Sequence, residues 1–417
     1  MNRPVRCRKE RHVPRQWNAY LSLFLVAFAV AYVTTPLARR IAWRLDAVDY
    51  PSKRRINKEP IPRMGGIAIF LGMFSALATQ WLGTRFLGWP LVLDTTPQLV
   101  VSSSHLHVNY LYIAISFVIV FVTGLLDDKY QLNPKQKLLG QLIAAAVAVA
   151  GGLVVGVIVN PVTDSLIDLG WLAYPLTMIY LVAYSNIINL IDGLDGLATG
   201  ISCISSLTMF ALSIMAGRID AAALSISVTG ATLAFLRYNF NPASIFLGDS
   251  GALLLGFVLG TVSLLSVTRV AGLTTLIVPL VIAGIPIMDT FSAIVRRSRA
   301  HVSIGQADRG HIHHRLIAEG FDQKQAVLLM YSWTAILCVG SFAMTQVTVW
   351  PRIAIFVILI AASAIFAVYL RLFQPVLLHH YNPETGADEL IDPQNPAFEA
   401  EEAKLESEKL ADRLPRI

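Results

Sequence analysis

Long apolar stretches recur along the chain, and they constrain its fold more than any other feature. Eleven segments of 16 to 21 residues are almost free of charged side chains. A helix needs roughly 20 mostly apolar residues to cross a bilayer, and the 14% of charged residues is far below the level of soluble domains. We therefore predict an all-α, polytopic integral membrane helical bundle with about eleven transmembrane helices. The predicted spans are residues 18–37, 64–83, 109–126, 138–157, 171–187, 197–216, 221–236, 251–268, 273–291, 326–346 and 351–371.

Basic residues are divided unevenly between the two sets of connections that these spans create. One set holds 22 Lys and Arg residues, whereas the opposite set holds four after the first span. Because Lys and Arg favour the cytoplasmic side, we predict that the first set faces the cytoplasm. The six basic residues of the N-terminal tail would then lie outside, against the rule. The basic-rich connections are residues 38–63, 127–137, 185–196, 237–250, 292–325 and 372–417.

The same pattern divides the chain into three parts. Residues 1–17 form a basic N-terminal tail, residues 18–371 the transmembrane domain, and residues 372–417 an acidic cytoplasmic C-terminal tail. Three prolines between residues 383 and 396 are expected to interrupt regular structure in that tail. From residue 397 the charges alternate in sign, which suits either a solvated helix or disorder. We interpret the C-terminal tail as dispensable for chemistry.

Two compositional features exclude other classes of protein. The three cysteines, Cys7, Cys203 and Cys338, have neither paired nor metal-ligand spacing, so we expect no disulfide framework and no zinc site. The net charge of +6 suits anionic lipid or an anionic substrate. No basic patch interleaved with aromatic residues indicates nucleic acid.

Adjacent acids follow the third predicted span directly. Asp127 and Asp128 begin the segment DDKYQLNPKQK, which ends at Lys137. Neighbouring carboxylates at a low-dielectric boundary repel each other, and an interfacial stop signal favours Lys and Arg over paired acids. A bound divalent metal or a proton-transfer role would justify the pair.

The segment LVAYSNIINLIDGLDGLATG (residues 181–200) carries a polar stripe between apolar residues. Its members, Asn186, Asn189, Asp192 and Asp195, recur at every third position. On an α-helix such residues are neighbours, so we expect Asn189, Asp192 and Asp195 to meet one ligand. Hydrogen bonding of the asparagines between helices is the alternative, and it leaves the two acids unexplained.

The motif FLGDSG places Asp249 at the entry to the predicted span 251–268. Asp249 or Ser250 could accept backbone N–H groups as a helix N-cap. A carboxylate here also suits a hard, oxygen-ligated cation such as Mg²⁺. The motif alone does not separate these two interpretations.

Two basic loops complete the polar set on this side. The segment HIHHR (residues 311–315) follows Asp308 and Arg309, and it lacks the Cys or helical His spacing of a zinc site. Arg and His side by side suit phosphate recognition, although a patch for charged lipid is the alternative. The Pro-rich basic loop 46–66 suits an anionic headgroup site and a positive-inside anchor equally well.

Metal-binding acids, phosphate-binding cations and lipid-facing walls on one side together indicate phosphoryl transfer to a lipid acceptor. A transporter with proton-relaying carboxylates is the competing class. It should place its acids near the bilayer centre, whereas here they lie at helix ends.

Four ordered motifs, DDKYQLNPKQK, NIINLIDGLDGLA, FLGDSG and HIHHRL, resemble those of the polyprenyl-phosphate N-acetylhexosamine-1-phosphate transferases, the family of MraY, WecA and TagO. The resemblance extends over residues 20–370. It implies a multi-pass enzyme of the bacterial plasma membrane with its active site facing the cytoplasm. It also implies transfer of a sugar phosphate from a UDP-N-acetylhexosamine donor to undecaprenyl phosphate, a polyprenyl phosphate lipid acceptor, with release of UMP and a requirement for Mg²⁺.

The resemblance also implies roles for individual residues. The resemblance implies catalytic roles for four acids, Asp127, Asp128, Asp192 and Asp195. It implies substrate binding by Lys137, His311, His313, His314 and Arg315. It implies metal binding by Asn189 and Asp249. One departure is Asn57, which stands where many relatives have a histidine, so a proton-transfer role at that position is not expected.

The form HIHHRL resembles the WecA and TagO branch more than the MraY branch. This favours UDP-N-acetylglucosamine as donor and undecaprenyl-diphosphate-N-acetylglucosamine as product, which would initiate cell-envelope polysaccharide or teichoic acid synthesis. The phospho-N-acetylmuramoyl-pentapeptide donor of peptidoglycan synthesis is the alternative. The oligomeric state is left open, with a homodimer as one possibility.

Overall fold

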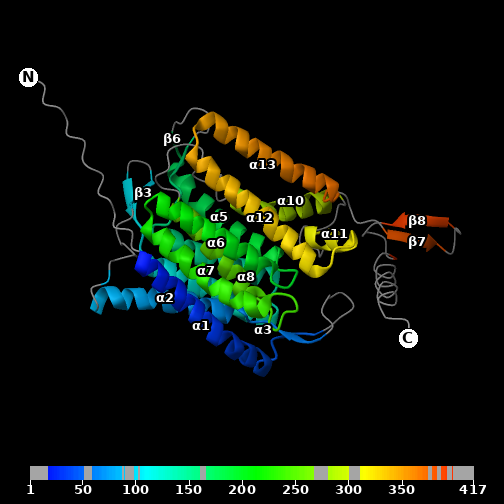
Figure 1. Ribbon diagram of the computed structural model, residues 1–417, viewed down its shortest axis with the longest axis horizontal. Coiled ribbons are helices and arrows are strands. Elements are labelled where there is room, and N and C mark those ends of the chain that lie inside the picture. The colour runs from blue at the N-terminus through cyan, green and yellow to red at the C-terminus, as the bar shows by residue number, and fades with distance from the viewer. Residues whose placement is uncertain are drawn as a thin grey trace, which may run out of the picture.

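The computed structural model of the protein is a bundle of long helices (Figure 1). It describes residues 17–50, 59–86, 89, 98–101, 104–159, 166–266, 280–299, 310–373, 378–382, 387–391 and 397. The helices are α1 (Trp17–Arg44), α2 (Gly66–Phe86), α3 (Tyr110–Tyr130), α4 (Pro134–Ala150), η1 (Gly170–Leu172), α5 (Ala173–Leu190), α6 (Leu197–Met215), α7 (Ile219–Asn239), α8 (Gly248–Ser266), α10 (Gly284–Arg299), α11 (Ile312–Ala318), α12 (Gln323–Gln346) and α13 (Val349–Tyr369).

In the described part of the chain, short strands form four antiparallel pairs outside the bundle. They are β1 (Val48–Asp49) with β2 (Ile61–Pro62), β3 (Gln98–Val101) with β4 (Ser104–His107), β5 (Val157–Val159) with β6 (Leu166–Asp168), and β7 (Leu378–Asn382) with β8 (Ala387–Ile391). The last pair corrects our expectation for residues 383–396. Pro383 falls between β7 and β8 in the sequence, so it does not interrupt either strand.

The predicted class, a polytopic helical membrane bundle, is confirmed. Within the described residues, nine helices are long and apolar enough to cross a membrane. The predicted span 138–157 corresponds to α4, which has 17 residues and begins earlier, at Pro134. Residues 273–279 of another predicted span lie outside the described residues, and the helix that follows, α10, continues to Arg299 with three arginines in its last turn.

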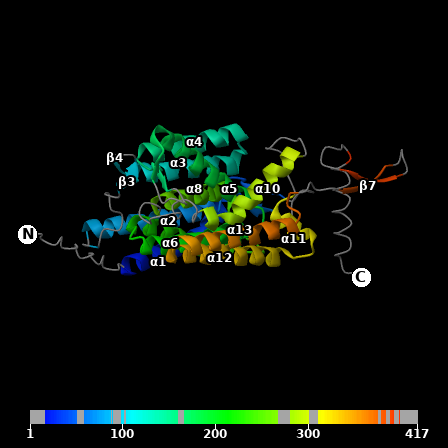
Figure 2. The ribbon, with the colours of Figure 1, turned by 90° about the horizontal axis from the view of Figure 1, so that it is seen from above.

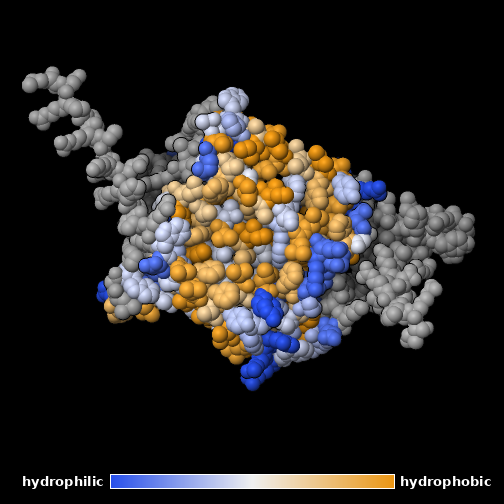
Figure 3. Space-filling model, viewed as in Figure 1, coloured by the Kyte–Doolittle hydropathy of each residue, from blue (hydrophilic) through white to orange (hydrophobic). Residues whose placement is uncertain are grey.

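The outer surface of the bundle suits contact with lipid. Apolar residues cover most of the face shown in Figure 3, and hydrophilic residues lie mainly toward its margins. On α13, large apolar side chains point outward, with Trp350 80% exposed and Ile365 71% exposed. In water such a surface would be unfavourable, whereas hydrocarbon accepts it.

The centre of the bundle is formed by α7 and α8, which are almost entirely buried. Helix α7 packs against α1, α2 and α6, and α8 packs against α3 and α5. Small residues dominate α7, and they allow helix backbones to approach closely in a membrane. The described thiols of Cys203 and Cys338 are free, and Cys7 lies outside the described residues.

A tight connection joins α3 to α4. Helix α3 ends at Tyr130 and is capped by Gln131, whose backbone is left-handed (φ 52°) and whose N–H donates to the Asp127 carbonyl. Helix α4 begins with a capping box in which Asn133 and Gln136 bond each other's backbone N–H groups, with Pro134 in the first turn. These signals reverse the chain within three residues, so the end of α3 lies beside the start of α4.

The two ends of the bundle carry different elements. Figures 1 and 2 show β3 at one end, and α11 and β7 at the other. The end of α3 and the starts of α4 and α8 meet through hydrogen bonds, and they carry the acids singled out in the sequence. Motifs that are separate in the sequence are therefore close enough in the fold to form one site.

Candidate active site

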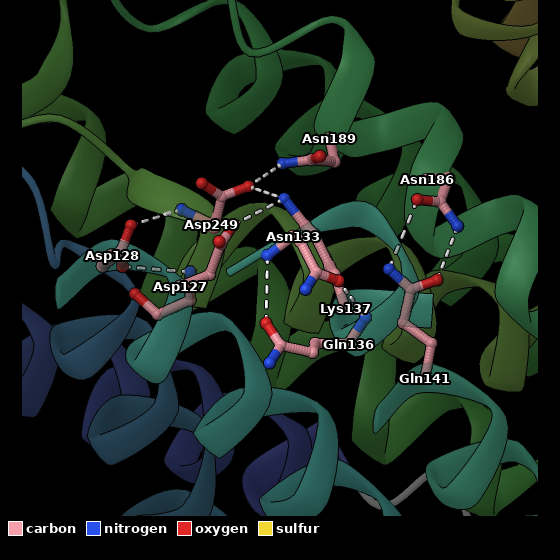
Figure 4. Close-up of polar contacts among 10 residues, drawn as sticks. Asp127, Asp128, Asn133, Gln136, Lys137, Gln141, Asn186, Asn189 and Asp249 are labelled. Atoms are coloured by element: carbon pink, nitrogen blue, oxygen red, sulfur yellow. Dashed lines mark hydrogen bonds and ion pairs between the residues drawn. The ribbon is translucent and has the colours of Figure 1, made fainter. Parts of the chain in front are cut away.

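Four side chains from four helices meet at the ends of α3 and α5 and the starts of α4 and α8 (Figure 4). The Lys137 Nζ lies 2.8 Å from Asp127 Oδ2 and also donates to Asp249 Oδ1. Asn189 Nδ2 donates to the same Asp249 oxygen over 2.6 Å. Asp249 is thus the point where three of the four sequence motifs come together.

Asp128 points to the start of α8 rather than to Lys137. Its Oδ1 accepts the Asp249 N–H over 2.7 Å, and its Oδ2 accepts the Ser250 N–H over 3.1 Å. Of the two interpretations of FLGDSG, the one in which Asp249 or Ser250 accepts the backbone N–H groups gives way to a cap supplied by Asp128 of α3. A carboxylate at this position satisfies two of the N–H groups that a helix start leaves unpaired, and it complements the helix dipole.

Gly248 makes this approach possible. Its backbone is left-handed (φ +73°), and a Cβ added there would lie 2.6 Å from Asp128 Oδ1. Any other residue would strain the backbone and displace the carboxylate. The paired acids of the sequence thus have different surroundings, since Asp127 contacts a cation and Asp128 contacts backbone.

This division predicts different results for the same substitution at two adjacent positions. Asp128→Asn places an amide donor against a backbone donor, so we expect it to lower the stability of the fold by about 1–2 kcal/mol. The thermal unfolding midpoint in detergent should fall. Asp127→Asn is the matched control, because it leaves the start of α8 capped. Equal midpoints for Asp128→Asn and the unsubstituted protein would contradict the assigned cap.

The stripe after α5 does not continue as a helix. Helix α5 ends at Leu190, and residues 191–196 form turns that end at Gly196, whose φ is +81°. The prediction that Asp192 and Asp195 share a helical face with Asn189 is therefore wrong. Glycines at 193 and 196 explain the ending, because they favour turns over helix.

Asp195 organises the loop before α8. Its Oδ2 accepts Asn241 Nδ2 over 2.9 Å and the Ala243 N–H over 3.0 Å. Asn241 also donates to Gln323 Oε1 at the start of α12, over 2.8 Å. Asp195 therefore ties the α7–α8 loop, and through it α12, to the turn after α5.

The carboxylate cluster, formed by Asp127, Asp128 and Asp249 with Lys137 and Asn189, contains three acids and one cationic side chain. Asp127 and Asp128 are 7% and 1% exposed, and Asp249 lies between Lys137 and Asn189. Burial raises the pKa of the neighbouring Asp192 carboxyl well above its usual range, although part of that residue is accessible, and the charge of Asp249 raises it further. Such an excess of negative charge favours a cationic ligand at the cluster.

The chemistry of the cluster fits a magnesium ion. Carboxylate and amide oxygens, as in Asp249 and Asn189, are ligands that Mg²⁺ prefers. Among the described residues, no three His, Cys, Asp or Glu side chains are arranged to hold a metal by themselves. Mg²⁺ is commonly bound by one or two carboxylates together with substrate phosphates.

The histidine segment is held by Asp289, a residue within the predicted span 273–291. His311 Nδ1 lies 2.9 Å from Asp289 Oδ2 on α10, and the Ile312 N–H donates to Asp289 Oδ1 over 2.8 Å. Arg315 is partly buried in α11. The side chains of His313 and His314, with Asp308, Arg309 and Asn57, lie outside the described part of the structure.

The alternative given for the asparagines, hydrogen bonding between helices, holds for Asn186, which joins α5 to α4 next to the cluster. Gln141 and Asn186 exchange amide hydrogen bonds of 3.3 and 2.6 Å. They lie one turn from Lys137 and Asn189 respectively, so they set the spacing of the two residues that bind Asp249 (Figure 4). A signal for both Gln141 and Asp289 was present, since each is a polar residue inside a predicted membrane span.

The bundle and the cluster at its helix ends describe a membrane-embedded enzyme, and comparison with known proteins gives its class. Residues 110–267 match the family Glycosyl transferase family 4. The "probable undecaprenyl-phosphate N-acetylglucosaminyl 1-phosphate transferase" of Bacillus subtilis is 37% identical over 344 residues, covering 82% of this chain and 90% of the relative. The chain therefore belongs to this family of membrane enzymes that transfer a sugar phosphate.

Two further relatives represent different branches. The decaprenyl-phosphate N-acetylglucosaminephosphotransferase of Mycolicibacterium smegmatis is 33% identical, over 76% of this chain and 80% of its own length. The phospho-N-acetylmuramoyl-pentapeptide-transferase of Shouchella clausii is 30% identical, over 76% of this chain and 94% of its own length. Membership confirms the resemblance that the four motifs indicated, and it decides for an enzyme over a transporter.

Proposed function

We propose that the protein transfers N-acetylglucosamine-1-phosphate from UDP-N-acetylglucosamine to undecaprenyl phosphate, producing undecaprenyl-diphosphate-N-acetylglucosamine and UMP. The observation that carries this proposal is the junction of Asp127, Lys137, Asn189 and Asp249 at helix ends that border the apolar surface. The names of the Bacillus subtilis and Mycolicibacterium smegmatis relatives, at 37% and 33% identity, support an N-acetylglucosamine phosphate and a polyprenyl phosphate. The product would initiate a cell-envelope polysaccharide or teichoic acid.

In the proposed reaction, an oxygen of the lipid phosphate attacks the sugar-bearing phosphorus of the donor. The new P–O bond forms as the P–O bond to UMP breaks, and UMP leaves with the electron pair. Asp127 is the paired acid suited to take a proton from the lipid phosphate, because Asp128 is engaged with the backbone of α8. Lys137, between Asp127 and Asp249, is placed to hold a phosphate oxygen.

Asp249 and Asn189 are the residues that would hold Mg²⁺. When bound, the ion would neutralise charge on the diphosphate and stabilise the leaving UMP. Asp195 fixes the backbone of the α7–α8 loop on the proposed nucleotide side, and Asp192 belongs to the same turn after α5. In this proposal the cluster faces the cytoplasm, as the distribution of Lys and Arg predicts, because the nucleotide donor is cytoplasmic.

The function is tested with purified enzyme, Mg²⁺, undecaprenyl phosphate and UDP-N-acetylglucosamine labelled in the sugar. We expect label in a lipid product and an equal amount of UMP, both abolished by EDTA and restored by added Mg²⁺. Release of UDP in place of UMP would indicate transfer of the sugar without its phosphate, and it would contradict the proposal.

A second donor is supported by one comparison. The relative from Shouchella clausii is named for transfer of a phospho-N-acetylmuramoyl-pentapeptide, and the match covers 94% of its length. A parallel reaction with the UDP-N-acetylmuramoyl-pentapeptide separates the two candidates. Turnover of this donor in place of UDP-N-acetylglucosamine would move the protein to the peptidoglycan branch.

A further inference from the structure

Helix α10 carries a buried polar face. Asp289, Ser292 and Arg296 occupy positions i, i+3 and i+7, so they lie on one side of the helix. Their exposed fractions are 0%, 0% and 3%. Buried polar side chains are almost always hydrogen-bonded. The partners of these three residues therefore show which segments of the chain are bound to α10.

Asp289 holds the start of α11. His311 is the residue before that helix, and its own side chain makes no capping hydrogen bond. The Asp289 carboxylate supplies the cap by accepting the Ile312 N–H over 2.8 Å, while its other oxygen lies 2.9 Å from His311 Nδ1. One carboxylate therefore sets both the direction of α11 and the orientation of the His311 ring.

The rest of the face secures the segments on either side. Arg296 Nη1 donates to the Leu372 carbonyl after α13 and lies 3.2 Å from Ser292 Oγ. The backbone of Gly310 lies against the guanidinium, because a Cβ there would be 2.3 Å from Arg296 Nε. Residues 310–312 are thus fixed to α10 by backbone, side-chain and packing contacts.

We propose that Asp289 is a positioning residue for the transfer reaction and that it acts through His311. An ionised carboxylate can only accept hydrogen bonds, so it holds the imidazole with its proton on Nδ1 and keeps Nε2 as the unprotonated, accepting nitrogen. The same carboxylate caps the start of α11, and this helix contains residues 312–315 of the histidine segment. The role in catalysis rests on the proposed function, whereas the contact itself does not.

The substitution Asp289→Asn separates charge from size. Its amide oxygen can still accept the Ile312 N–H, but its NH₂ group then faces His311 Nδ1. A donor at that point forces Nδ1 to accept, so the ring proton moves to Nε2. We expect a switch from the Nδ1–H to the Nε2–H tautomer and a fall in kcat of about 10²-fold or more.

The tautomer is read by ¹⁵N NMR of the full-length enzyme labelled at histidine, with His311→Gln assigning the signal. Turnover and the thermal unfolding midpoint are measured on the same samples. Ser292→Ala is the matched control, because it alters the same buried face and leaves both Asp289 contacts in place. It should keep the Nδ1–H tautomer and turnover. Asp289→Glu retains the carboxylate and should restore the tautomer with part of the activity.

The outcomes distinguish this inference from the proposed function. An Nε2–H tautomer in the unsubstituted enzyme would overturn the inference, and this measurement needs no variant to fold. A switched tautomer in Asp289→Asn with unchanged kcat would also overturn it. If the unsubstituted enzyme turned over neither donor, the proposed function would fail, while the tautomer would still report on the contact of Asp289 with His311.

Discussion

Asp249→Asn is expected to reduce turnover by about 10³-fold while the protein still inserts and folds. The Asp249 carboxylate accepts hydrogen bonds from Lys137 and Asn189, and it is the acid where the motifs converge. The variant retains the size of the side chain but loses its charge, which both Lys137 and a divalent cation require. Formation of labelled lipid and release of UMP measure the loss.

The matched control for this variant is Asp168→Asn. Asp168 is an exposed acid on β6, before α5 begins, whereas Asn189 of the cluster lies near the end of α5. The substitution of Asp168 removes the same charge. It should leave turnover unchanged, and both variants should elute as the unsubstituted protein does on size exclusion. Turnover of Asp249→Asn within a factor of ten of the unsubstituted enzyme would remove Asp249 as a metal ligand.

Lys137→Met is expected to reduce turnover by about 10²-fold or more. Lys137 lies between Asp127 and Asp249, so its loss leaves two carboxylates facing each other without a cation. In the proposed reaction the variant also lacks the group that holds the lipid phosphate, so its KM for undecaprenyl phosphate should rise. Lys135→Met is the control, because Lys135 is exposed two residues earlier on the same helix.

A double substitution separates the two roles of Lys137. Because Asp127 is also the proposed base, the double variant is compared in stability and in lipid binding, not in turnover. If the lysine only balances Asp127, then adding Asp127→Asn to Lys137→Met should recover the thermal unfolding midpoint, and undecaprenyl phosphate should bind as tightly as in the unsubstituted enzyme. If the lysine contacts the lipid phosphate, the double variant should still bind undecaprenyl phosphate more weakly, and unweakened binding would contradict that role.

The membrane bundle was predictable because the cost of placing a charged or polar group in hydrocarbon acts on each short segment of the chain. Every helix of the nine long apolar ones in the described residues overlaps a segment that hydropathy identified. The starts and ends of α3 and α4 follow in the same way from neighbouring residues, such as Asn133 and Gln136. The candidate acids were also identifiable, because unpaired carboxylates at a membrane boundary require an explanation.

The partners of those acids depend on contacts between distant segments, which no local pattern contains. Asp127 and Asp128 are adjacent in the sequence, yet one pairs with Lys137 and the other caps α8, 121 residues away. Asp289 lies within an apolar stretch of the sequence, and its contact with His311 is evident only from the packing of the folded chain. Hydropathy and capping preferences therefore specify which segments cross the membrane and where helices begin. The packing of those helices specifies which oxygen faces a cation and which faces a backbone N–H, because hydrogen bonds depend on distances that only the folded chain defines.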